Sequence, residues 1–269
     1  MTLFDERARL VANAGAGPNL FVATFEAPRL AQSVQPGQFA HMQIPGMESH
    51  ILRRPFSVYG RSLASQTVDI LYQVVGAGTR HLSGISPRSD LAEGFGLIGP
   101  VGRGWSPPAA TSRALLVGGG VGAAPLFMLA ESLKGQGVPA TVVLGAQTHA
   151  ALACEAAYLD LLGEDDVRCA TDDGSYGRPG FCTSLATEAL DQAAAEGRPF
   201  DYVAVCGPEP LMRIVAQEAR ERGVACEVSM ERRMACGVGA CLSCVVETAP
   251  GKKRSCVDGP VFDGSEVLW

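Results

Sequence analysis

Four cysteines crowd into the C-terminal part of the chain at a spacing suited to binding metal: Cys236, Cys241, Cys244 and Cys256. The pattern C-x4-C-x2-C, followed later by a further cysteine, is the spacing used by plant-type [2Fe–2S] clusters. Two irons and two bridging sulfides need four thiolates from a compact loop. Gly237 and Gly239 let the backbone wrap closely and direct N–H groups toward sulfur. The pattern therefore predicts a [2Fe–2S] cluster.

Two other interpretations of this cluster remain open. Structural zinc also accepts four thiolates in a tetrahedron, although the paired C-x2–4-C spacing typical of zinc sites is only just met by Cys236 and Cys241. The cysteines could also carry no ligand. A disulfide framework is disfavoured, because the total of nine is odd and no secretion signal precedes the chain. The other five lie in apolar segments and are expected to be buried, reduced thiols: Cys154, Cys169, Cys182, Cys206 and Cys226.

A second group of residues suits the binding of a phosphate and a ring. In the segment Arg53-Arg54-Pro55-Phe56-Ser57, the two guanidinium groups are bidentate donors that match phosphate. Pro55 stiffens the turn, and the hydroxyl of Ser57 can donate or accept beside a ring. The alternative is an exposed basic turn that leads into a strand.

Two glycine-containing turns follow apolar runs and suit a dinucleotide. Gly119, Gly120 and Gly122 let the backbone approach a pyrophosphate, whose charge the following helix N-terminus attracts. The spacing is not the strict G-x-G-x-x-G, so a tight turn without ligand is the alternative. Cys206 and Gly207 end a later apolar run, where ligands of open α/β sheets lie, although Cys206 could equally be a buried thiol.

The elements that position these residues fall into three parts. Residues 1–108 carry strand-like runs broken by Pro, Gly and Ser, which predict an antiparallel β-barrel or sandwich. Residues 109–228 alternate short apolar runs with helix-like stretches, which predict a doubly wound α/β domain. Residues 229–269 show neither period and form a small cluster module. We therefore expect a multidomain chain, with the barrel as the first part.

Composition narrows the class of partner. The net charge is −6 and the sequence pI about 5.3, which argues against nucleic acid or an anionic membrane as the main partner. We see no signal peptide and no apolar run of roughly 18 residues, so we expect a soluble, cytoplasmic protein. The four histidines lack ligand spacing and are interpreted as surface or structural residues: His41, His50, His81 and His149.

The order of these motifs resembles the ferredoxin reductase superfamily and, more closely, the electron-transfer subunits of NAD-linked dihydroorotate dehydrogenases. The segment from Ser229 to Cys244 carries the most specific part of the resemblance, and Thr171–Gly177 also resembles a family segment. The resemblance implies FAD, a [2Fe–2S] cluster held by the four tail cysteines, and NAD. It implies FAD contacts at nine residues: Arg54, Pro55, Phe56, Ser57, Leu71, Tyr72, Gln73, Gly78 and Thr79.

The resemblance also implies a function. Electrons would pass from the FMN of a catalytic partner subunit through the cluster and FAD to NAD, in a heterotetramer that serves pyrimidine biosynthesis. We find no candidate for a general base or other catalytic residue. Residues 145–152 lack the arginine that would accept a 2′-phosphate, which favours NAD over NADP. The alternatives are a reductase subunit of another oxidoreductase complex or of an oxygenase, and a non-enzymatic zinc-binding interaction protein.

Overall fold

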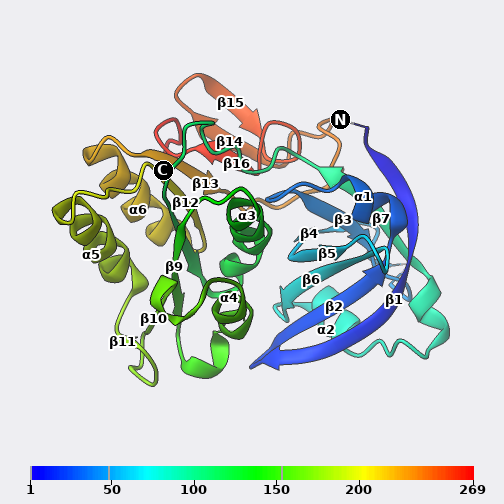
Figure 1. Ribbon diagram of the computed structural model, residues 1–269. Coiled ribbons are helices and arrows are strands. Elements are labelled where there is room, and N and C mark those ends of the chain that lie inside the picture. Colours follow the sequence, from blue (N-terminus) through cyan, green and yellow to red (C-terminus); the bar gives the residue numbers. More distant parts are fainter. Residues whose placement is uncertain (1, 48, 153) are drawn as a thin grey trace.

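The computed structural model describes residues 2–47, 49–152 and 154–269. Its N-terminal part is a seven-stranded antiparallel sheet that curls into a barrel (Figure 1), in the order β4-β3-β7-β1-β2-β6-β5. Its strands are β1 (Phe4–Gly17), β2 (Leu20–Glu26), β3 (Phe39–Gln43), β4 (Arg54–Ser57), β5 (Gly60–Ser62), β6 (Thr67–Gln73) and β7 (Phe95–Val101). Short helical pieces cover the barrel: α1 (Pro28–Ser33), α2 (Ala77–Ser83) and the 3₁₀ turn η1 (Asp90–Glu93).

Alternating residues build the barrel core. On β6, Val68, Ile70 and Tyr72 are buried, and they pack against Phe25 of β2 and Phe95 of β7. Strand β1 was not predicted, because its fourteen residues mix charged, apolar and small side chains. The barrel that the sequence predicted is confirmed.

The second part is a seven-stranded sheet in the order β11-β10-β9-β8-β12-β13-β16. Its strands are parallel except β16, which runs antiparallel to β13. The strands β8, β9 and β12 are buried at every position, as expected for a sheet covered on both faces. Their bounds are β8 (Ala114–Gly119), β9 (Ala140–Ala146), β10 (Val167–Thr171), β11 (Arg178–Pro179), β12 (Tyr202–Cys206), β13 (Ala225–Ser229) and β16 (Val261–Asp263).

Helices cover both faces of this sheet, which confirms the doubly wound arrangement. The face toward the barrel carries α3 (Ala124–Gly135) and α4 (Glu155–Leu162), and the opposite face carries α5 (Cys182–Ala195) and α6 (Glu209–Glu221) (Figure 1). Short 3₁₀ turns complete this part: η2 (Gly120–Ala123), η3 (His149–Ala151) and η4 (Glu164–Asp166). No helix in the described part of the chain is long and apolar enough to cross a membrane.

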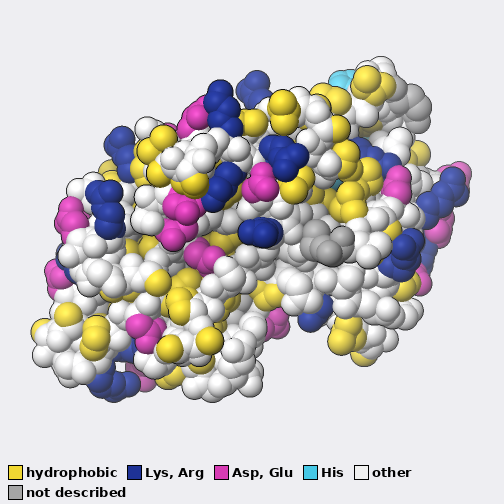
Figure 2. All heavy atoms as spheres, turned by 90° about the horizontal axis from the view of Figure 1, so that it is seen from above, with side chains coloured by type: hydrophobic (Ala, Val, Ile, Leu, Met, Phe, Trp, Pro, Cys, Tyr) yellow, Lys and Arg dark blue, Asp and Glu magenta, His cyan; other side chains and the backbone are white. Residues whose placement is uncertain are grey.

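The C-terminal part lies against both larger parts. Its hairpin consists of β14 (Val245–Thr248) and β15 (Gly251–Arg254), and β16 extends the α/β sheet by pairing Phe262 with Val228. Met234, Cys244 and Cys256 pack against Phe39 and Val101 of the barrel. One face of the molecule shows Lys and Arg interspersed with Asp and Glu rather than gathered by sign (Figure 2).

Candidate cofactor sites

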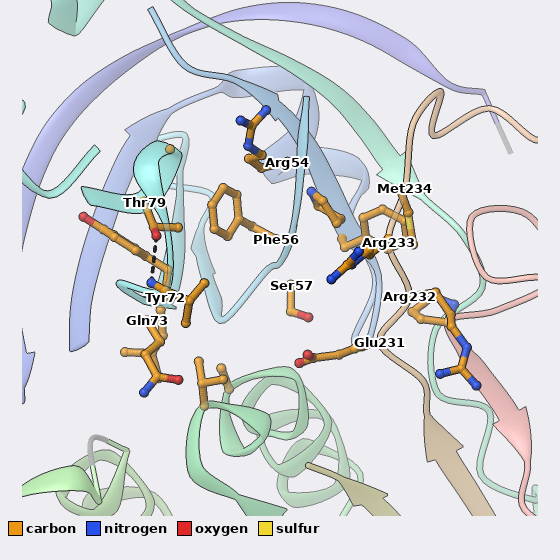
Figure 3. Close-up of a pocket in the computed structure, with 18 of the residues that line it drawn as sticks. Arg54, Phe56, Ser57, Tyr72, Gln73, Thr79, Glu231, Arg232, Arg233 and Met234 are labelled. Carbon is orange, nitrogen blue, oxygen red and sulfur yellow. Dashed lines mark hydrogen bonds between the residues drawn. The ribbon is translucent and has the colours of Figure 1, made fainter. Parts of the chain in front are cut away.

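A cavity of about 700 Å³ opens between the barrel, the start of α3 and the segment that precedes the cysteine cluster. Figure 3 shows side chains from these three regions directed into one space. All nine residues that the resemblance assigned to FAD line this cavity, on β4, β6 and the start of α2: Arg54, Pro55, Phe56, Ser57, Leu71, Tyr72, Gln73, Gly78 and Thr79.

Arg54 is a cation of this cavity that is suited to phosphate. Its guanidinium donates to the carbonyl of Leu52 and forms no ion pair among the residues that the structure describes. A Cβ atom at Gly78 would lie 3.0 Å from Arg54 Nε, so the absence of a side chain there lets the arginine lie against the start of α2. Thr79 Oγ1 accepts hydrogen bonds from the backbone N–H groups of Val75 and Gly76, at 2.9 and 3.2 Å, and fixes that turn.

Arg53 has a different role from the phosphate contact considered in the sequence analysis. It donates to the Asp5 carboxylate at 2.8 Å and to the Gly96 carbonyl at 2.9 Å, and its side chain is only 18% exposed. Since these groups occupy its donors, Arg53 ties β4 to β1 and β7 rather than facing the cavity.

The cavity has an apolar, rigid wall that suits a flat ring. Phe56 and Tyr72 meet edge to face with ring centroids 6.0 Å apart. The Tyr72 hydroxyl donates to Asn13 Oδ1 at 3.0 Å, and burial raises the pKa of this phenol to about 12, so it stays protonated at neutral pH. This bond holds the tyrosine ring in place.

Several residues of the cavity wall were missed as site residues, including four that directly precede the cysteine motif: Glu231, Arg232, Arg233 and Met234. The sequence analysis assigned them to the cluster module. The Glu231 carboxylate points into the same space as Ser57 (Figure 3), and desolvation raises its pKa. The sequence offers one signal that could have identified these residues, namely two arginines beside a glutamate directly before the cysteine motif.

The glycine-rich turn lies next to this cavity rather than in its wall. Val121 and Ala124 line the cavity, whereas Gly119, Gly120 and Gly122 do not. Instead, the turn η2 that follows β8 packs against the end of β12: a Cβ at Gly122 would lie 2.7 Å from the Cys206 carbonyl oxygen and from Gly207 Cα. Burial raises the pKa of the Cys206 thiol, which lies 3.7 Å from the Ser229 carbonyl oxygen and is therefore a buried, protonated group.

The four tail cysteines come together as two pairs. The Sγ atoms of Cys244 and Cys256 are 3.3 Å apart, and Cys236 and Cys241 interact through their side chains. Burial disfavours the Cys236 thiolate, but backbone N–H groups, including those of Val238 and Cys241, lower the pKa of this thiol to about 6. The loop therefore offers one ionisable thiol with N–H groups directed at its sulfur, as a cluster site requires.

The pairing suits a dinuclear cluster. One zinc ion needs three or four ligands around a single point. Two irons that each take two thiolates need two pairs, which is the arrangement seen. Gly239 lets the cysteine loop pack closely against Val257, because a Cβ there would lie 2.6 Å from Val257 Cγ2. Its φ of +86° also favours glycine. The donor set therefore fits a [2Fe–2S] cluster.

Known proteins resemble this chain over nearly its whole length. A family model described as the iron-sulfur cluster binding domain of dihydroorotate dehydrogenase B matches residues 231–268. The dihydroorotate dehydrogenase B (NAD(+)) electron transfer subunit of Desulforamulus reducens is 36% identical, over 99% of this chain and 98% of that protein. The subunit of the same description from Bacillus caldolyticus is 40% identical over 89% of this chain and 90% of that protein.

Solved structures show the same architecture. The structure of the NADH-dependent reduced ferredoxin-NADP oxidoreductase, reported for flavin-based electron bifurcation, superimposes with a TM-score of 0.83 at 30% identity, over 98% of this chain and 90% of that one. The ferredoxin reductase in carbazole 1,9a-dioxygenase superimposes with a TM-score of 0.68 at 20% identity, over 83% and 67%, and shares the fold.

Proposed function

The chain belongs to the family of dihydroorotate dehydrogenase B electron transfer subunits, and we propose that it carries electrons from a catalytic partner subunit to NAD. The partner contains FMN and oxidises dihydroorotate in pyrimidine biosynthesis, and the two kinds of subunit form a heterotetramer. The site of action is the cytoplasm. When bound, FAD exchanges a hydride with nicotinamide and single electrons with the cluster.

The closeness of the flavin cavity and the cysteine loop carries this proposal. Phe39 and Met234 line the cavity and also pack with Cys244 and Cys256. One layer of side chains therefore separates the two sites, which suits electron transfer between them. Arg54 and the start of α2 would hold the phosphates of FAD, and Phe56 and Tyr72 would hold its ring.

The cluster loop presents an apolar surface to the partner. Leu242 is 63% exposed and Val238 is 47% exposed, and Cys241 is exposed between them. Leu242 also has a φ of +58°, a backbone conformation that leucine seldom adopts. Exposed apolar groups beside a redox centre mark the docking surface for the partner.

The test compares the chain alone with the chain and its catalytic partner. Alone, it should reduce dyes with NADH but should not oxidise dihydroorotate, and adding the partner should restore NAD-linked turnover. Leu242→Asp should lower partner-coupled turnover at least about tenfold, the equivalent of about 1.4 kcal/mol, because the carboxylate would be desolvated at the interface. Its iron content and its NADH–dye activity should match those of the wild type.

The matched control is Leu63→Asp, since Leu63 is 61% exposed on the turn between β5 and β6 and does not belong to the cysteine loop. This variant should keep partner-coupled turnover. Dihydroorotate oxidation by the unaided chain would refute the proposed function. Equal effects of the two variants would refute only the docking surface.

We also predict a preference for NADH over NADPH of at least about tenfold in kcat/KM, which corresponds to about 1.4 kcal/mol. The loop after β10 lies against the loop after β9: the N–H groups of Asp172 and Asp173 donate to the carbonyls of Ala146 and Gln147, at 3.0 and 3.2 Å. These two carboxylates would repel a 2′-phosphate bound beside the end of β9. Dye reduction at varied nucleotide concentration measures the preference. Asp172→Asn should reduce the preference for NADH, and Asp165→Asn, at an exposed position, should leave it unchanged. Equal kcat/KM values for NADH and NADPH in the wild type would contradict the prediction.

A further inference from the structure

The imidazole of His41 is fully buried, and neither of its nitrogens has a hydrogen-bond partner among the described residues. Burial, together with the nearby guanidinium groups of Arg53 and Arg54, lowers the pKa of His41 to about 4, so at neutral pH the ring is neutral and carries one N–H donor. The backbone carbonyls of Arg53 and Cys236 lie nearby, but neither has ordinary hydrogen-bond geometry. A buried donor and acceptor without partners costs free energy. The sequence analysis interpreted this histidine as surface or structural, and its burial without partners calls for a specific role.

The position of His41 is set by strand β3. Residues Ala40 and Met42 point into the barrel core, so Phe39 and His41 point to the opposite face. On that face Phe39 packs with Cys244 and Cys256. Across the ladder, His41 lies opposite Pro55 of the flavin-binding strand. The ring therefore lies on the barrel surface that the cysteine loop covers.

The cysteine loop touches this ring directly after its first ligand. A Cβ atom at Gly237 would lie 2.5 Å from His41 Nδ1 and 3.0 Å from its Cγ, so the backbone of Gly237 lies close against the imidazole. Gly237 also has a φ of +69°. Both observations explain why a glycine follows Cys236: a side chain at position 237 would clash with His41, and residues other than glycine rarely adopt this φ.

The charged neighbours of the ring cannot accept a hydrogen bond from it. The neighbouring charges are Arg53 and Arg54, which are cations and cannot accept a hydrogen bond. The contacts on the loop side are the backbone of Cys236 and Gly237. Sulfur of a cluster held at Cys236 would be an acceptor next to this ring, in an interior where a donor has a strong effect.

We propose that His41 is a positioning residue that donates a ring N–H to the sulfur at the Cys236 corner of the cluster and so raises the cluster's reduction potential. The inference rests on the cluster that the proposed function requires. A hydrogen bond to sulfur stabilises the more negative, reduced form and is a known means of tuning such potentials. A histidine that only fills space would leave the potential unchanged.

The test uses the full chain, with the cluster in place, in the variants His41→Leu and His41→Asn. Leucine removes the donor, whereas the asparagine amide keeps one near the Nδ1 position. In an EPR-monitored redox titration, His41→Leu should shift the one-electron equilibrium about tenfold toward the oxidised cluster, which corresponds to about 59 mV. His41→Asn should recover most of this shift. The control is His50→Leu, because His50 is exposed and its ring bonds only to Ser49 among the residues with described placement.

A second measurement needs no variant. In protein labelled with ¹⁵N-histidine, pulsed EPR of the reduced cluster should show a nitrogen coupling from one of the four histidines. Wild-type protein with about two irons but no such coupling would overturn the proposal, as would an unchanged potential in His41→Leu. Failure of the wild type to contain iron would instead count against the proposed function. If His41→Leu loses its cluster, the labelled wild type still decides the question.

Discussion

Replacing Cys244 with serine should empty the cluster site, so that iron and acid-labile sulfide fall from about two each per chain to near zero. Cys244 is buried, and its Sγ lies 3.3 Å from that of Cys256. A serine hydroxyl does not ionise at neutral pH, so the second iron would keep only one thiolate. Iron and sulfide assays on anaerobically prepared protein, together with visible absorption, measure the loss.

The same variant should separate two activities of the chain. NADH–dye reduction should persist, because the residues of the flavin cavity and of the glycine-rich turn lie outside the cysteine loop. Partner-coupled dihydroorotate oxidation should be abolished. The control is Cys226→Ser, a half-buried thiol whose pKa burial raises to about 12 and which lies apart from the two pairs. Full iron in Cys244→Ser, or stoichiometric zinc in a colourless wild type, would contradict the assignment.

The cysteine site could be predicted because its information is local. Three ligands fall within nine residues, and their spacing reflects the size of the cluster they surround. The parallel sheet was also predictable, since strands buried on both faces are apolar without interruption. The cysteine ligands are close together in sequence, and the residues of the buried strands are all apolar or small, so a local pattern reveals both features.

Strand β1 shows why other features could not be predicted. Glu6 lies on a buried face of this strand and is only 9% exposed, which contradicts the usual pattern of a charged residue. Its carboxylate accepts hydrogen bonds from the backbone N–H groups of Arg29 and Leu30, at 2.9 and 3.0 Å. The partners that make this burial acceptable are 23 and 24 residues away, so no local pattern reveals them.

The part of the cavity wall that comes from the C-terminal segment could not be predicted for the same reason. Glu231 and Met234 belong to the flavin cavity only because β16 pairs with β13 and brings the C-terminal part against the barrel. The boundary predicted at residue 228 therefore divides the sequence but not the structure, since Val228 and Phe262 from its two sides pair in one sheet. A site formed where three parts meet depends on tertiary packing that periodicity does not encode.

Replacing Arg54 with alanine should weaken FAD binding about 10- to 150-fold, because a charge-assisted hydrogen bond contributes about 1.5–3 kcal/mol. The guanidinium has no ion-pair partner among the described residues and lies beside Gly78, so its charge is available to a phosphate. Arg54→Lys should recover part of the affinity, since lysine keeps the charge but loses the fork that contacts two oxygens. Flavin fluorescence during titration of the FAD-free protein measures the dissociation constants.

The control for this change is Arg80→Ala. Arg80 is exposed on α2, the helix that contains Gly78, but it does not line the cavity. Its loss should change FAD affinity by no more than about twofold, the scatter usual for surface substitutions. The iron content of all three variants should equal that of the wild type, because the cysteine loop does not contact these side chains through any described hydrogen bond. If Arg54→Ala bound FAD as tightly as Arg80→Ala, the phosphate would have to be held by another cation of the cavity, and Arg232 and Arg233 would be the next residues to replace.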